Sequence, residues 1–185
     1  MKIGIIVGHT KKSQGAFSKT LGQSEYVYNS GLAAMIAEHA AGLSDQVKIE
    51  TRDVGGVAGA FKRILAWKPD CVIELHFNAA NGRASGAETL FSDNYDAHGI
   101  RELALAQLTA RAMADALGIP SRGVKERTSS GERGFFNLSQ TTKTPCVLIE
   151  SGFGDNPVDA SRMKVRKLQL AQAIVAAARR WKAAA

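Results

Sequence analysis

Two histidines and a glutamate stand at or just beyond the ends of three apolar stretches of this chain. His9 follows the stretch 3–7, His76 lies near the end of 71–77, and Glu150 ends 146–150. If these stretches are strands of an open α/β sheet, their carboxyl ends meet at one edge, where such folds bind ligands. Two imidazoles with one or more carboxylates are the donors of a hydrolytic zinc site, in which three protein ligands leave the fourth position to water. His9 and His76 are far apart in the chain, however, and form no local zinc motif.

The elements that would position these side chains follow from hydrophobic periodicity. Short β-branched or alternating runs predict strands over 3–7, 47–51, 71–77, 87–91 and 146–150. Apolar residues at helical spacing predict helices over 24–42, 57–67, 99–117 and 165–181. Ser24 is the expected cap of the first helix. Residues 121–144 are rich in Arg, Ser, Gly and Thr and are interpreted as a long functional loop or irregular hairpin, and 152–157 as a turn.

The alternation of strands and helices predicts an α/β fold. We expect one domain with a mostly parallel, twisted central sheet of about six strands, flanked by helices on both faces. A length of 185 residues suits a single domain. We place the catalytic domain at 1–182 and set 183–185 apart as an appended alanine tail.

Composition narrows the class of protein without choosing its function. Hydrophobic residues make up 45% and charged residues 22% of the chain, as in ordinary globular domains. The net charge of +7 favours an acidic partner, either nucleic acid or an anionic cell envelope. The two cysteines form neither a disulfide framework nor a CxxC metal motif. We find no export signal and no apolar run long enough to span a membrane, and therefore expect synthesis in the cytoplasm.

A series of short motifs extends along nearly the whole chain. They are Gly8-His9, Glu25 with Asn29, Thr51-Arg52, Leu75–Ala79, Gly86–Thr89, Arg122–Lys125, and Pro145–Phe153 with Asn156. Together they resemble the motifs of the zinc-dependent N-acetylmuramoyl-L-alanine amidases called amidase type 3, which occur in bacterial cell-wall remodelling and in phage endolysins.

The resemblance implies a site and a reaction. Zn²⁺ would be held by His9, Glu25 and His76, and Glu150 would be the catalytic residue. A zinc ion at such a site polarises a carbonyl and activates a water at neutral pH. Glu150 could take a proton from that water and pass it to the departing amine. The implied substrate is peptidoglycan, and we expect a monomer that does not bind nucleic acid.

Glu74 departs from the family pattern, which commonly has a small or apolar residue two positions before the second histidine. Residues two apart on a strand share a face, so Glu74 should lie about 6.6 Å deeper than His76 along the strand. A carboxylate there can accept the other N–H of a metal-bound imidazole. We favour this supporting role over replacement of Glu25 as a ligand, but the sequence leaves both open.

Three functions remain open from the sequence. The first is a phage endolysin or other lytic enzyme that acts on the cell wall after release, through a holin if phage-encoded, with the net charge promoting adsorption to the envelope. The second is a cytosolic amidase that recycles soluble muropeptides. The third is a non-catalytic basic module that binds glycan or nucleic acid. The presence of both histidines and both glutamates favours an enzyme, and the absence of an export signal favours the endolysin.

Overall fold

The central feature of the computed structural model, which describes residues 1–92, 97–141 and 143–184, is a six-stranded sheet. Its strands are β1 (Lys2–Val7), β4 (Gln46–Thr51), β5 (Cys71–Asn78), β6 (Ala87–Phe91), β7 (Ser121–Glu126) and β8 (Cys146–Phe153), in the order β4-β1-β5-β8-β6-β7. The first four strands in that order run parallel, while β6 is antiparallel to β8 and parallel to β7. The predicted α/β fold with a mostly parallel sheet is confirmed.

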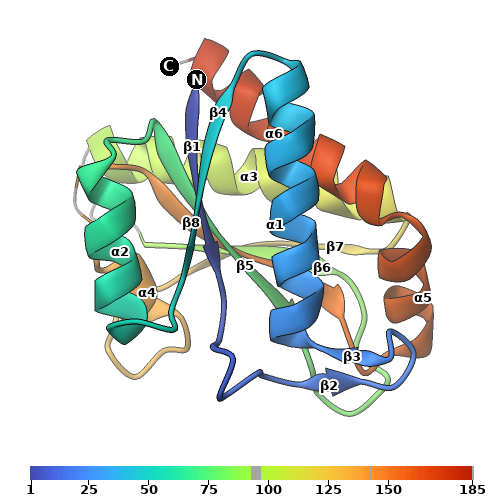
Figure 1. Ribbon diagram of the computed structural model, residues 1–185. Coiled ribbons are helices and arrows are strands. Elements are labelled where there is room, and N and C mark those ends of the chain that lie inside the picture. Colours follow the sequence, from blue (N-terminus) through green and yellow to red (C-terminus); the bar gives the residue numbers. More distant parts are fainter. Residues whose placement is uncertain (93–96, 142, 185) are drawn as a thin grey trace.

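Helices cover both faces of the sheet, as expected (Figure 1). They are α1 (Glu25–Gly42), α2 (Gly56–Ala66), α3 (Ala97–Leu117), α4 (Phe135–Leu138), α5 (Pro157–Val165) and α6 (Lys167–Ala183). Helix α6 packs against both α1 and α3 over one face, and α2 and α4 lie on the other. A two-residue pair, β2 (Phe17–Ser18) and β3 (Gln23–Ser24), precedes α1, which Ser24 caps by accepting a hydrogen bond from the Val27 amide. Among the described residues, no helix combines the length and apolar character needed to cross a bilayer.

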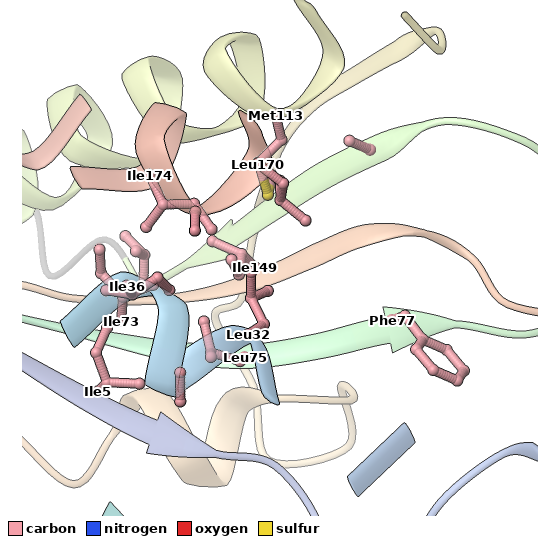
Figure 2. Close-up of a cluster of buried hydrophobic side chains, with 14 of the residues drawn as sticks. Ile5, Leu32, Ile36, Ile73, Leu75, Phe77, Met113, Ile149, Leu170 and Ile174 are labelled. Carbon is pink, nitrogen blue, oxygen red and sulfur yellow. The ribbon is translucent and has the colours of Figure 1, made fainter. Parts of the chain in front are cut away.

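The main core fills the face under α1, α3 and α6. Figure 2 shows Ile73, Leu75 and Ile149 of the sheet meeting Leu32 of α1 and Leu170 of α6. A smaller cluster on the opposite face joins Ile6, Val72 and Leu148 to α2 and α4. Because successive strand residues point to opposite faces, alternate positions along β1, β5 and β8 divide between the two clusters.

The same alternation determines where polar strand residues point. On β5, Ile73 and Leu75 belong to the main core, so Glu74 and His76 point toward the face of α2 and α4. Glu150 of β8 is the register partner of His76 and shares that face. On that side, His76 and Glu150 line a cavity at the carboxyl ends of these strands.

Two local expectations were wrong, and one helix was not expected. Residues 121–126, expected to lie in a long loop or irregular hairpin, form the edge strand β7, which runs parallel to β6. Its side chains are exposed or half-buried, so the segment lacks an apolar pattern. Strand β8 continues through the expected turn as far as Phe153. The expected final helix over 165–181 corresponds to α6, which begins after Arg166. The helix before it, α5, was not expected; Asn156 caps it and Pro157 occupies its first turn.

Replacing Ile73 by alanine should destabilise the fold, because its side chain is fully buried in the main core. Cavity-forming substitutions of this type cost about 2–5 kcal/mol in the free energy of unfolding, measured by urea denaturation. Ile100→Ala is the matched control, since Ile100 is 71% exposed on α3 and should change the free energy of unfolding by less than about 0.5 kcal/mol. Equal losses in the two variants would contradict this assignment of the core.

Candidate metal centre and active site

His9 leaves β1 in a backbone conformation that directs its ring toward the end of β5. Its φ is +66°, in the left-handed region, and the Gly8 amide donates a 3.0 Å hydrogen bond to the Leu75 carbonyl. A Cβ atom at Gly8 would overlap the imidazole of His76, so only glycine lets the two strands approach this closely. The rings of His9 and His76 meet edge to face with centroids 5.2 Å apart.

Glu25 lies between the two imidazoles. It is the first residue of α1, is 4% exposed, and extends over the end of the sheet. Its Oε2 is 3.0 Å from His9 Nε2, and its Oε1 is 2.8 Å from His76 Nδ1 and accepts a hydrogen bond from the Phe77 amide. Burial alone would raise the pKa of Glu25, but the interactions with His76 and His9 outweigh burial and lower it to about 2.

These three side chains fit a divalent metal. One donor atom from each of His9, Glu25 and His76 lies within 4.8 Å of the others. Two imidazole nitrogens and a carboxylate oxygen are a donor set that catalytic zinc sites use. The loop before α1 closes over them at Gly15, where φ is +74° and a Cβ would lie 2.7 Å from both Glu25 Oε2 and the His9 ring. The sequence therefore predicted a group of donors that the structure brings together.

Glu150 faces the same space from β8. It is 1% exposed, and its Oε1 accepts a hydrogen bond from Arg133 Nη2. Its Oε2 is buried and has no hydrogen-bond partner in the part of the chain that the structure describes. Burial raises the pKa of Glu150, although the nearby His76 and Arg133 act in the opposite direction. An unpaired carboxylate oxygen with a raised pKa is suited to exchanging a proton with a bound molecule.

Glu74 lies beneath His76, on the face that the sequence predicted. Its Oε1 is 3.4 Å from His76 Nε2, the ring nitrogen that points away from Glu25. The same carboxylate, which is fully buried, forms an ion pair with the partly buried Arg52, and its Oε2 accepts a 2.9 Å hydrogen bond from Asn137. Arg52 Nη2 is also 3.1 Å from His76 Nε2. These contacts leave Glu74 placed to hold the His76 ring from behind, and it is not part of the three-residue donor group.

These residues open onto a cavity of about 400 Å³. His9, Glu25, His76 and Glu150 all line it, together with Arg133 and Asn137 from the segment that follows β7. The sequence analysis did not identify Arg133 or Asn137 as site residues. Their segment is polar and lacks hydrophobic periodicity, so no local pattern indicated that it folds back over the strand ends.

A chain of polar contacts connects the cavity to the edge of the sheet. Arg133 donates to Asn78 Oδ1, and Asn78 Nδ2 donates to Glu88 on β6. Glu88 also accepts a 2.8 Å hydrogen bond from Arg122 Nε, whose guanidinium lies 5.2 Å from the ring centroid of Phe153. Several of the motifs recognised in the sequence are thus joined in space by these contacts.

Comparisons with known proteins agree with this geometry. A family model described as N-acetylmuramoyl-L-alanine amidase matches residues 3–180. The amidase LytC of Bacillus subtilis is 34% identical over 108 residues, which cover 57% of this chain and 20% of LytC, so the chain matches about a fifth of that relative's length. The catalytic domain of the CD27L endolysin targeting Clostridia difficile is 26% identical, with 97% of each chain covered and a TM-score of 0.78. An N-acetylmuramoyl-L-alanine amidase from Clostridium difficile 630 is also 26% identical, with 98% and 96% covered and a TM-score of 0.80.

Substitutions of Glu25 and Glu74 should differ in their effect on zinc affinity. Glu74→Gln should weaken Zn²⁺ binding by about 10- to 100-fold, as expected for a residue that supports a ligand. Glu25→Ala should weaken it considerably more, because a direct donor is lost. Zn²⁺ competition titration against a chelating dye measures both, with Glu38→Gln, an exposed position on α1, as the control. The reverse ranking would show that Glu74 is the third ligand.

Proposed function

Because the chain belongs to the N-acetylmuramoyl-L-alanine amidase family, we propose that it hydrolyses the amide between the lactyl group of N-acetylmuramic acid and L-alanine in peptidoglycan. The proposal includes a Zn²⁺ ion held by His9, Glu25 and His76. The observation that carries it is the convergence of these three donors and the buried Glu150 on one cavity.

The metal and the protein side chains would contribute differently to the reaction. Zn²⁺ at this position supplies Lewis acidity toward the amide carbonyl and lowers the pKa of water. His9 and His76 would each bind the metal through a ring nitrogen that carries no proton. The low pKa of Glu25 keeps its carboxylate ionised, so that it can donate an electron pair to the metal. The Phe77 amide and the Glu74 carboxylate hold Glu25 and His76 in orientation from behind.

Glu150 would carry the proton. An amide nitrogen is a poor leaving group until it is protonated, so one group must take a proton from the attacking water and deliver it to that nitrogen. Oε2 of Glu150 is free to do so, because Arg133 occupies Oε1. Burial of the carboxylate favours its protonated form, which suits delivery of the proton in the second step.

We propose lysis of the cell wall as the biological role. The coverage shared with the CD27L endolysin catalytic domain supports it, as does the net charge of +7, which would attract the domain to anionic wall polymers. Zymography on intact sacculi, compared with hydrolysis of soluble muropeptides, tests this role against recycling in the cytoplasm. Stoichiometric zinc without release of L-alanine termini from either substrate would instead favour a binding module.

Removing the carboxylate of Glu150 should separate catalysis from metal binding. Glu150→Gln should retain stoichiometric Zn²⁺ but lose about 100- to 10,000-fold in kcat, the usual contribution of general acid–base catalysis. Zinc content by elemental analysis and turnover of a muropeptide provide the two measurements. Loss of zinc from this variant would make Glu150 a ligand.

The pH dependence of the wild-type enzyme follows from the same residue. The first step needs the ionised form of Glu150. Burial raises the pKa of this carboxyl above its ordinary value of 4.5, so the ionised form is lost at a higher pH than for an exposed glutamate. We therefore expect kcat/KM to decline on the acid side before pH 4.5 is reached, with zinc content measured at each pH as the control. Undiminished kcat/KM down to pH 4.5 would contradict the assignment.

Attraction to the wall should depend on ionic strength. Charges beyond about 8 Å are screened at physiological salt, so the rate on intact walls should fall as NaCl rises from 20 to about 300 mM. The rate on a short neutral muropeptide is the internal control and should change little. A rate on walls that does not depend on salt would exclude electrostatic adsorption.

A further inference from the structure

Arg133 reaches the cavity from a segment that is held in a defined shape. Glu132 Oε2 accepts hydrogen bonds from the amides of Thr128 and Ser129, at 2.6 and 3.0 Å. The Arg127 amide donates to the Phe91 carbonyl at the end of β6, and Arg127 Nε donates to the Arg133 carbonyl. The backbone that carries Arg133 is thus attached to the sheet on its N-terminal side.

The C-terminal side of the segment is fixed as well. Gly134 turns the chain into α4 with φ of +89°, and a Cβ there would lie 2.9 Å from the Leu90 side chain. One turn later, Asn137 donates to the buried Glu74. Arg133 therefore stands at a fixed point in the cavity wall, between two anchored ends.

The guanidinium of Arg133 has unused donors. Nη2 contacts both Glu150 Oε1 and Asn78 Oδ1, whereas Nε and Nη1 have no acceptor among the described residues. The side chain remains 64% exposed although its tip touches a buried carboxylate. Its remaining N–H groups are accessible to a molecule in the cavity, and guanidinium groups hydrogen-bond carboxylates strongly.

The chemistry of the proposed reaction tells which part of the substrate Arg133 would meet. A group that delivers a proton to the departing nitrogen must lie on the amine side of the scissile bond, and that group is Glu150. Arg133 is hydrogen-bonded to Glu150, so it also lies on the amine side, where the peptide begins, and not on the sugar side. The residue after L-alanine in such peptides is acidic, and its main-chain carboxyl occurs either free or as an amide.

We propose that Arg133 is a specificity-determining residue that recognises the free carboxylate of the residue following L-alanine. The proposal rests on the proposed amidase function for the direction in which the substrate lies. The unused donors, the fixed backbone and the exposure of the side chain supply the recognition. The charge of the cavity wall also suits an anionic group of the substrate. The acidic residues of the wall are Glu25 and Glu150, and a divalent metal bound to Glu25 would give the wall a net positive charge.

Matched substrates test the proposal. N-acetylmuramoyl-L-Ala-D-Glu and N-acetylmuramoyl-L-Ala-D-isoglutamine differ only in that carboxyl group. Wild type should show a kcat/KM about 10- to 100-fold higher for the acidic substrate, the usual range for a charge-assisted hydrogen bond. Arg133→Gln should abolish this preference: KM should rise for the acidic substrate only, in addition to a loss of kcat that both substrates share because Glu150 loses its partner. Arg133→Lys should restore part of the preference. Arg111→Gln, which removes an exposed arginine on α3, should behave as wild type.

Two results would overturn the proposal. One is a wild-type enzyme that cleaves both substrates equally well. The other is an Arg133→Gln variant that loses kcat equally on both substrates and keeps the wild-type preference, since Arg133 would then act only by holding Glu150. Circular dichroism and zinc content establish that each variant is folded and loaded.

A binding measurement separates this proposal from the amidase function. Calorimetric titration with the dipeptides L-Ala-D-Glu and L-Ala-D-isoglutamine needs no turnover. If wild type cleaves neither muropeptide but binds the acidic dipeptide more tightly, and Arg133→Gln loses that difference, the amidase function fails while recognition by Arg133 stands. Equal binding of the two dipeptides to wild type would overturn the recognition itself.

Discussion

The parallel pairing of β5 with β1 and β8 is the constraint on which the candidate site depends. It aligns Val7 with Leu75, and His76 with Glu150, so that the carboxyl ends of three strands lie level. A slip of one residue in either pairing would turn His76 or Glu150 toward the main core, because side chains alternate between faces. The apolar residues between the polar ones prevent such a slip, since it would expose Ile73 and Leu75 and bury charge in their place.

Charge compensation is the second requirement, because the site buries several ionisable groups. Glu74 is paired with Arg52, and Glu150 with Arg133, while Glu25 lies between two imidazoles. A buried charge without a partner is strongly destabilising, whereas a paired one is tolerated at a modest net cost. These pairs also orient the groups: each of the three carboxylates is held by hydrogen bonds on at least one oxygen, which limits the rotation of its side chain.

The segment from 127 to 138 gives the site a wall that the sheet cannot supply. Strand ends place donors along one line, but a cavity needs a second side, and here it comes from the chain that follows β7, including α4. Contacts of Arg133 and Asn137 with residues of β5 and β8 attach that wall to the strand ends. The wall therefore belongs to the same hydrogen-bonded structure as the proposed metal ligands, and substitutions in it can affect substrate preference.

The sequence by itself determined the strands that carry the site, because β1, β5 and β8 are buried on both faces and are mainly apolar, with the polar residues of β5 and β8 near their carboxyl ends. It also indicated that His76 and Glu74 share a face, which follows from the two-residue period of a strand. It did not predict β7 or α5. An edge strand with half-exposed side chains has no apolar pattern. The start of α5 does have a local signal, the Asn156 cap followed by Pro157, but the helix itself has no strong apolar periodicity.

Periodicity did not indicate which polar residues meet. The resemblance to a family named the group of His9, Glu25 and His76, and the tertiary structure shows how these residues come together. Glu25 reaches His9 and His76 because α1 begins just beyond the sheet edge, and that position depends on the packing of α1 against β1, β5 and α6. Arg133 reaches Glu150 because of a turn at Gly134 and hydrogen bonds to distant strands. Neither feature produces a periodic pattern in the sequence. Periodicity reports the face on which a residue lies, whereas contacts between separate elements depend on how those elements pack together.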